Sequence, residues 1–319
     1  MADLQRKFTT AGLITAISAA LMPIWAAPAN AATSTGFVVS PAFEQLQIKS
    51  TALQSQYTLQ ITNHNATDQI FLLRVVDFGT LDESGGVAFL GTPTTELEHK
   101  YGLASWMSLE KNTIFVPADK SVGVLVSIEN RQSLATGGHY GAVLATAVSD
   151  TDARVGDRVT VKQVLASLVL VTKEGGAAAD LRLARQQSNS EFWKLPTQVN
   201  LRFQNAGNVH VVPRGTVEIK DPFGRLVQRS AINEGSNVIL PESFRNYKSV
   251  FTHVAPGVWP GYYSQTTRFR YDGKDAITSQ SAGFWYAGKL LVGLMILVVF
   301  VGLLTLTAWM WQRKHRNKS

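Results

Sequence analysis

The feature that most constrains this chain is an uncharged stretch close to its C-terminus. Residues 290–311 are 22 consecutive residues without a formal charge. At 1.5 Å per helical residue this run is ~33 Å long, enough to cross the hydrocarbon core of a bilayer. Aromatic residues flank the run as interfacial belts do: Phe284, Trp285 and Tyr286 before it, Trp309 and Trp311 at its end. We therefore expect a transmembrane helix over residues 284–312.

A basic segment follows the expected span. Residues 313–319 include Arg313, Lys314, Arg316 and Lys318. A short positive flank marks the cytoplasmic side of a membrane helix. We therefore expect a single-pass type I protein of the cell membrane, with its body outside the cell and its C-terminus in the cytoplasm. Trp285, Trp309, Trp311, Arg313 and Lys314 are the expected anchor residues.

The N-terminal 31 residues have the pattern of a signal peptide. Arg6 and Lys7 precede an apolar, alanine-rich stretch over residues 11–27, and Ala29-Asn30-Ala31 matches an A-x-A cleavage site. An uncleaved N-terminal anchor is the alternative. Pro23 and the small residues around it favour cleavage, so we expect the mature chain to start near Ala32.

The composition of the exported body excludes several classes of protein. The formal charge of the whole chain is +7. Residues 32–288 carry 23 Lys and Arg against 22 Asp and Glu, so the excess lies in the leader and near the anchor. No basic face for nucleic acid is indicated. The chain contains no cysteine, so its domains depend on core packing without disulfides.

Most local patterns in the body are those of β-strands. Apolar and polar residues alternate around Leu59, over 121–129 and over 199–204. A period of two places one face of a strand on a core and the other in water. Three further runs are long, apolar and β-branched, as expected of central strands: 70–78, 140–148 and 159–171. The sequence therefore predicts an all-β body of antiparallel sandwiches.

A flexible segment over residues 173–180 divides this body. We expect two tandem immunoglobulin-like β-sandwich domains, at 32–175 and 176–283. Both halves contain an alternating strand that ends in an Asn turn, at Asn63 and at Asn205. Coincidence of common turn residues is the alternative to such a repeat. Residues 180–187 fit either a helix or a strand, and their β context favours a strand.

Six short motifs occur in order within residues 36–172: Pro41-Ala42-Phe43-Glu44, Ile61-Thr62-Asn63, Val76-Asp77-Phe78, Ala104-Ser105-Trp106-Met107, Ile114-Phe115-Val116-Pro117 and Gly137-Gly138-His139-Tyr140-Gly141. This succession resembles the extracellular, peptidoglycan-binding domain of WxL-interacting proteins. The resemblance implies a bacterial surface protein that attaches to peptidoglycan or another wall glycan and holds WxL-domain or other surface proteins. The second domain is similar to generic bacterial immunoglobulin-like sequence, so no host-binding role is carried over.

The sequence of the exported body does not indicate a catalytic, cofactor or metal site. Its histidines are scattered without metal-ligand spacing, and it has no G-x-S-x-G elbow. Aromatic rings are better candidates, because exposed rings stack on sugars. The candidate ligand contacts are Tyr101, Trp106, His139, Tyr140 and Trp259. The alternatives are a core position for Trp106 and a backbone-bonded turn for His139. Trp259 is expected to be exposed, where it packs on the domain edge or faces the membrane or a partner.

The sequence therefore predicts a non-enzymatic, membrane-anchored binding or scaffolding protein of a bacterial cell envelope. The alternative is a chaperone or assembly factor for surface fibres. That alternative predicts an exposed apolar strand edge beside an unfilled groove. A signalling ectodomain is disfavoured by the short tail, and an envelope enzyme by the scattered polar residues.

Overall fold

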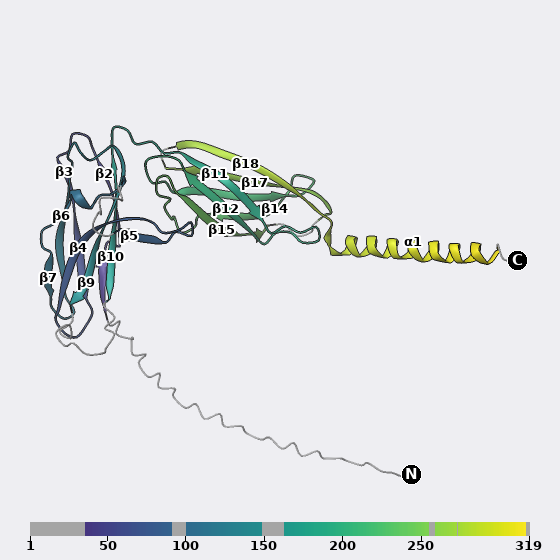
Figure 1. The fold of residues 1–319 in the computed structure, drawn as a ribbon, viewed down its shortest axis with the longest axis horizontal. Coiled ribbons are helices and arrows are strands. Elements are labelled where there is room, and N and C mark those ends of the chain that lie inside the picture. The colour runs from purple at the N-terminus through teal and green to yellow at the C-terminus, as the bar shows by residue number, and fades with distance from the viewer. Residues whose placement is uncertain (1–35, 91–99, 149–162, 255–258, 273, 317–319) are drawn as a thin grey trace, which may run out of the picture. The chain divides into compact units, whose positions relative to one another are not determined.

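The computed structural model describes residues 36–90, 100–148, 163–254, 259–272 and 274–316 (Figure 1). Within these ranges the chain is built from strands up to Tyr286, apart from the short 3-10 turn η1 (Ala104–Trp106), and ends in helix α1 (Gly288–Arg316). The expected class, all-β with one terminal apolar helix, is confirmed. The predicted signal peptide lies outside the described residues.

The first ten strands form two sheets. Sheet A has the order β1-β3-β8-β6: β1 (Phe37–Ser40), β3 (Gln54–Asn63), β8 (Ser121–Glu129) and β6 (Met107–Leu109). Sheet B has the order β2-β10-β9-β4-β5, and β7 also pairs with β4: β2 (Phe43–Ile48), β10 (Val164–Lys173), β9 (Gly137–Val148), β4 (Gln69–Thr80), β5 (Val87–Leu90) and β7 (Thr113–Val116). We call this pair of sheets the first sandwich.

The chain changes sheets between β1 and β2, at the cis peptide bond Ser40–Pro41. Strand β1 pairs antiparallel with β3 in sheet A, whereas β2 pairs parallel with β10 in sheet B. The Leu168 amide donates to the Ala42 carbonyl at 2.9 Å, which starts the second ladder. The crossing strand therefore ties both sheets together along one edge.

The predicted alternation corresponds to the core of the first sandwich. Leu59 and Ile61 of β3 are fully buried, as are Val126 and Ile128 of β8. They pack against inward side chains of sheet B such as Phe71. Burial of such side chains stabilises a fold by about 1.5–3 kcal/mol each, which explains why the two sheets pair face to face.

The remaining strands form a second sandwich with its own core. Sheet C has the order β11-β12-β15: β11 (Leu181–Ser188), β12 (Gln198–Asn205) and β15 (Phe244–Val250). Sheet D has the order β16-β14-β13-β17-β18: β16 (Thr252–His253), β14 (Leu226–Ile232), β13 (Pro213–Lys220), β17 (Gly261–Tyr271) and β18 (Lys274–Tyr286). The preference for a strand over residues 180–187 is confirmed by β11.

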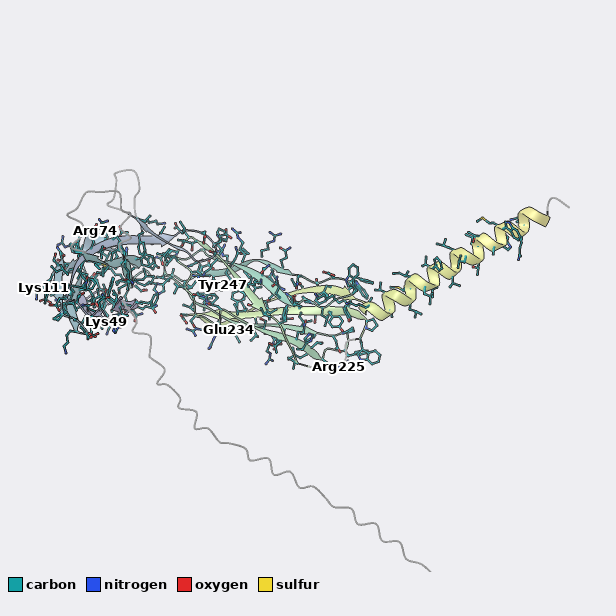
Figure 2. All side chains as sticks on the ribbon, turned by 90° about the horizontal axis from the view of Figure 1, so that it is seen from below. Lys49, Arg74, Lys111, Arg225, Glu234 and Tyr247 are labelled. Atoms are coloured by element: carbon teal, nitrogen blue, oxygen red, sulfur yellow. The ribbon has the colours of Figure 1, made fainter. Side chains whose placement is uncertain are left out.

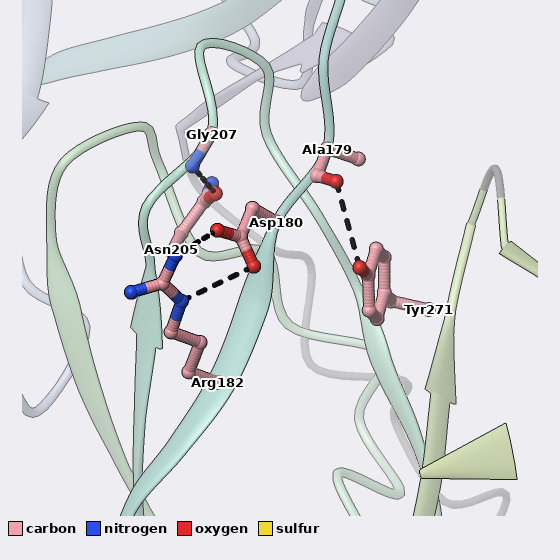
Figure 3. Close-up of polar contacts among 6 residues, drawn as sticks. All are labelled: Ala179, Asp180, Arg182, Asn205, Gly207 and Tyr271. Atoms are coloured by element: carbon pink, nitrogen blue, oxygen red, sulfur yellow. Dashed lines mark hydrogen bonds and ion pairs between the residues drawn. The ribbon is translucent and has the colours of Figure 1, made fainter.

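The entry to the second sandwich is fixed by short polar contacts (Figure 3). Asp180 pairs with Arg182 at 2.6 Å, and the Tyr271 hydroxyl donates to the Ala179 carbonyl at 3.5 Å. Gly207 is held there by the Asn205 side chain, which accepts its amide at 3.0 Å. A Cβ on Gly207 would lie 2.3 Å from the Ala178 carbonyl oxygen, so only glycine fits.

The two predicted Asn turns have the same bonding. The buried Asn63 side chain donates to the carbonyls of Thr67 and Val116 and accepts the Asn65 amide at 3.0 Å. The buried Asn205 side chain donates to Val209 and Ile239 and accepts the Gly207 amide. Each asparagine replaces ladder bonds where its strand ends. The two sandwiches therefore share this turn geometry, while the tandem repeat itself stays a prediction.

The terminal helix begins later than the sequence predicts. Phe284, Trp285 and Tyr286 belong to β18, where they pair with residues 261–263 of β17. The Phe284 and Tyr263 rings stack at 5.7 Å between centroids, so these residues are held on the sheet instead of starting the helix. Residues 291–313 of α1 form a candidate span with a mean hydropathy of 2.7. Arg313 and Lys314, expected in the tail, are part of α1.

Candidate binding surface on the first sandwich

Two predicted ligand contacts, His139 and Tyr140, lie inside the protein. Their exposed fractions are 3% and 1%. The His139 ring nitrogens lie 3.1 Å from the Gly102 carbonyl and 2.8 Å from the Ala135 carbonyl. This matches the backbone-bonded turn histidine that we weighed as the alternative. Neither side chain offers a surface to a wall polymer, because a glycan has to reach the ring face.

Tyr101 and Trp106 are half-buried and already engaged. The Trp106 ring packs against the core and against His139, with 6.1 Å between ring centroids. The Tyr101 hydroxyl donates to Glu242 at 2.9 Å. These contacts favour the core position for Trp106. They also make Tyr101 part of the junction between the sandwiches. Trp259, by contrast, is 55% exposed.

The two sheets of the first sandwich differ on their outer faces. The outer face of sheet A is polar, with Gln56, Thr58 and Gln60 on β3 and Ser121 and Ser127 on β8. This is the usual pattern for an antiparallel sheet with one face in water. The outer face of sheet B is largely apolar, although its inner face already packs on the core; its polar members include Arg74, Thr146 and Gln45.

One part of the apolar outer face is covered by the second sandwich. Val76 and Phe78 of β4, with Tyr140 of β9, are buried in a cluster that Val238 and Leu240 complete. Burial also raises the pKa of the Tyr140 phenol. This cluster is small and lies outside the two sandwich cores, so it joins them through apolar contact.

A cavity of about 410 Å³ lies beside this cluster. Its floor is the outer face of sheet B, and its opposite wall is the segment from Gly235 to Leu240 and the start of β15. The apolar lining on the floor comes from four strands: Phe43, Phe78, Val87, Leu168 and Leu170. Asp82 and Arg245 are the charged residues of its lining. The cavity is therefore an apolar groove with a few polar groups at its margin, as ligand sites commonly are.

No side chain of the described residues covers the rest of the outer face. Phe115 of β7 pairs with Ile70 of β4, which pairs on its other side with Val148 of β9. These side chains are 56%, 45% and 42% exposed, and Leu72 and Val164 add 46% and 47%. We call these five residues the apolar patch. Arg74, labelled on the first sandwich in Figure 2, is the next outward residue along β4 after Leu72.

Polar contacts hold the β4–β5 hairpin against the second sandwich. The Glu83 carboxylate accepts a bidentate pair from Arg202, with Nε at 2.8 Å, and a bond from the Asn246 amide at 2.9 Å. The Arg202 hydrogen bonds lower the pKa of Glu83. A second contact joins Glu242 to Lys100 and Tyr101. Both carboxylates are partly exposed, so these pairs fix geometry more than they add stability.

A buried histidine lies at the same junction. His210 is 8% exposed, and its ring lies 5.8 Å from that of Tyr140 between centroids. The Gln45 amide donates to Nε2, and Nδ1 lies 3.4 Å from the Tyr140 hydroxyl. Burial lowers the pKa of His210 from 6.5 to about 4. The neutral ring is therefore part of the joint between the sandwiches.

Metal chemistry has no support in the part of the chain that the structure describes. No group of three or more His, Asp or Glu side chains there could hold a metal ion. The feature that sheet B does offer is an apolar groove next to exposed apolar side chains. The sequence carried the signal for this surface in residues 70–78 and 140–148, which are apolar without alternation and so indicate strands covered on both faces.

Comparisons with known proteins are remote. No protein-family model and no curated protein matches the chain. Among solved structures it is similar to the class 5 fimbriae chaperone CfaA, at 13% identity and a TM-score of 0.42, over 77% of this chain and 98% of that one. It is also similar to the E. coli chaperone DraB, at 9% and 0.38 over 78% and 98%. For the Pseudomonas aeruginosa CupB2 chaperone the values are 11% and 0.34 over 77% and 100%. Likeness at this level supports no functional conclusion.

Proposed function

We propose that this chain is a membrane-anchored chaperone or assembly factor that holds an apolar, extended segment of another exported protein on sheet B of its first sandwich. We further infer that both sandwiches are immunoglobulin-like. The leader and the basic residues after the span indicate that the sandwiches lie outside the cell and that α1 crosses the membrane once.

The observation that carries this proposal is the apolar outer face of sheet B. A sheet that is apolar on both faces needs a cover on each. Among the described residues, the second sandwich covers one part and leaves the groove and the apolar patch open. Each patch side chain is about half exposed, so a partner that covers it gains about 1 kcal/mol per residue. Five such residues offset part of the cost of association, and backbone hydrogen bonds to the partner have to supply the rest.

Strand edges beside this surface fit an extended partner. Strand β2 pairs with β10 only from Leu168 onward. Among the described residues, Val164, Leu165 and Ala166 therefore pair with β9 on one side and with no strand on the other. Strand β5 pairs only with β4, and its Val87 and Phe89 are 38% and 45% exposed. An added strand takes backbone hydrogen bonds from such an edge and side-chain pockets from the adjacent face. Both parts are present on sheet B.

Attachment to peptidoglycan stays a prediction from the family resemblance. The rings that we expected to stack on sugars are buried or bonded in the first sandwich. The WxL-domain partners implied by the same resemblance stay predictions as well. Wall binding would require exposed aromatic rings, whereas the assembly-factor proposal requires the apolar outer face of sheet B.

The proposal can be tested by photo-crosslinking in the cells that make the protein. A photoreactive phenylalanine analogue replaces Leu72 in the apolar patch of the full chain. The matched control carries it at Leu125, which is 36% exposed on the polar face of sheet A. We expect one exported protein to crosslink at position 72 and not at 125, and its assembly on the surface to fall in an Ile70→Thr, Leu72→Thr variant.

Two results would contradict the proposal. Equal crosslinking at positions 72 and 125 would mean that the patch has no preferred partner. Normal surface assembly of the crosslinked protein in the double variant would mean that the contact is not used. Pelleting of the full chain with purified peptidoglycan, unchanged by the double variant, would return the wall-binding prediction to first place.

A further inference from the structure

We propose that the end of the second sandwich next to α1 is a membrane-docking surface, whose aromatic side chains lie in the headgroup region of the bilayer that α1 enters. This inference concerns a different face of the protein from the binding surface on sheet B. It goes beyond anchoring by the helix, because it makes the folded domain itself a lipid-binding element.

The surface lies directly beside the start of the helix. Tyr286 ends β18 and Gly288 begins α1, so a single residue, Ala287, separates the sheet from the helix. The Ala287 amide donates to the Phe192 carbonyl at 2.7 Å, which fixes this residue to the loop between β11 and β12. The connection is therefore one residue long, which keeps this end of the sheet close to the start of the helix.

Ring contacts and backbone contacts gather the other members at the same end. Tyr262 pairs with Trp285 across β17 and β18, and their rings meet edge to face at 5.5 Å. The Trp259 carbonyl accepts the Tyr263 hydroxyl at 2.7 Å. A Cβ on Gly261 would lie 2.5 Å from Pro222, which places the β13–β14 turn beside the start of β17. Phe223 is at the tip of that turn, where the Gly224 amide donates to the Asp221 carbonyl.

These side chains form what we call the aromatic collar: Phe192, Trp193, Phe223, Trp259, Tyr262 and Trp285. Their exposed fractions are 47%, 49%, 70%, 55%, 52% and 64%. Rings in the core of this sandwich, such as Phe203, Tyr263 and Phe269, are buried. Several exposed rings on one end of a domain mark an interaction surface. Trp and Tyr prefer the membrane–water interface, where an apolar ring and a polar tip are both satisfied.

The charged residues around the collar nearly cancel, so attraction to anionic lipids is not needed for docking. Lys194 and Lys289 are exposed, and Glu191 lies close to Lys194 through two backbone hydrogen bonds. Arg225, labelled in Figure 2, is engaged by Asp221 at 2.6 Å and lies 5.3 Å from the Phe223 ring. The local charge is therefore only slightly positive, and burial of the rings is the main contribution. The occupant that we assign is the interface of a bilayer, whatever its headgroup charge.

The absence of cysteine from the sequence makes the test direct, because a single introduced cysteine is the only thiol. The full chain is placed in phosphatidylcholine nanodiscs with a nitroxide label on Phe223→Cys. The water-exposed reference is Leu53→Cys, at a side chain 89% exposed on the first sandwich. The lipid reference is Leu297→Cys in α1. Accessibility to oxygen and to an aqueous nickel chelate is then measured for each label.

We expect the label at 223 to lose nickel accessibility and gain oxygen accessibility relative to the label at 53. In a Trp259→Ser, Tyr262→Ser background the label at 223 should shift toward the aqueous reference. A Leu81→Ser background, on the first sandwich, should leave it unchanged.

An aqueous reading at 223 together with a lipid reading at 297 would overturn the docking surface while leaving the anchor intact. An aqueous reading at 297 would remove the premise and the proposal with it. Protection at 223 that appears only when anionic lipid is added would also overturn it, because the aromatic rings would then not be the cause.

Discussion

The buried His210 makes the joint between the two sandwiches sensitive to acid. Its pKa is lowered by burial from 6.5 to about 4. In the folded protein the ring stays neutral down to about pH 4, whereas in the unfolded chain it binds a proton below pH 6.5. The unfolded state therefore binds more protons between these values, and stability falls as the pH falls through this window.

The size of the effect follows from the same two values. Protonation of His210 makes the equilibrium constant for unfolding about 30-fold larger at pH 5 than at pH 7.5. This factor corresponds to about 2 kcal/mol of stability. The contribution of this residue is fully present above pH 6.5 and is lost on acidification toward pH 4. The new proton would also lie at Nε2, where the Gln45 amide already donates. Protonation therefore disrupts the contact between the two sandwiches.

The assay is urea unfolding of the full chain in nanodiscs at pH 7.5 and pH 5.0. A His210→Gln variant serves as the control, because it cannot take up the proton while every other titrating group is retained. We expect the difference between the two pH values to be about 2 kcal/mol larger for the natural chain than for the variant. The same pH dependence in both proteins would refute the reasoning.

Three further predictions concern stability. Asn205→Ala leaves the Val209 and Ile239 carbonyls and the Gly207 amide without their partner, so it should lower the free energy of unfolding by about 3 kcal/mol in urea titrations; an unchanged midpoint would contradict this. Phe203→Ala removes a fully buried ring and should cost about 3–5 kcal/mol, seen in the unfolding transition of the second sandwich and not the first. Leu72→Thr changes a half-exposed side chain and should alter stability by less than about 0.5 kcal/mol, so a larger loss by thermal unfolding would disqualify it as a binding variant.

Local patterns in the sequence predict much of this fold. Leu59 and Ile61 lie on the core face that their alternation indicates, and β11 is a strand as its context predicts. The helix boundary is wrong by four residues, because Phe284 to Tyr286 gain more from pairing with β17 than from extending α1. The apolar content of residues 284–286 alone does not distinguish a strand from the first turn of a helix.

The proposed binding surface is harder to predict because it depends on contacts distant in sequence. Tyr140 has the residue type of a ligand contact, yet it is buried by Val238 and Leu240, about a hundred residues away along the chain. Phe115, Ile70 and Val148 become neighbours only through the ladders of sheet B. The sequence of β4 and β9 does not alternate between apolar and polar residues. This pattern indicates a sheet that is covered on both faces, but it does not identify the covering element.

The single residue between β18 and α1 has a mechanical consequence. Under the proposed function, a partner held on the first sandwich and pulled away from the cell would transmit tension to α1 through β18. That strand pairs with β17 almost along its whole length, from Tyr286 opposite Gly261 to Thr278 opposite Phe269. Tension along the strand loads these hydrogen bonds together in shear instead of opening them one by one. The protein should therefore resist pulling forces better than its marginal folding free energy alone would indicate.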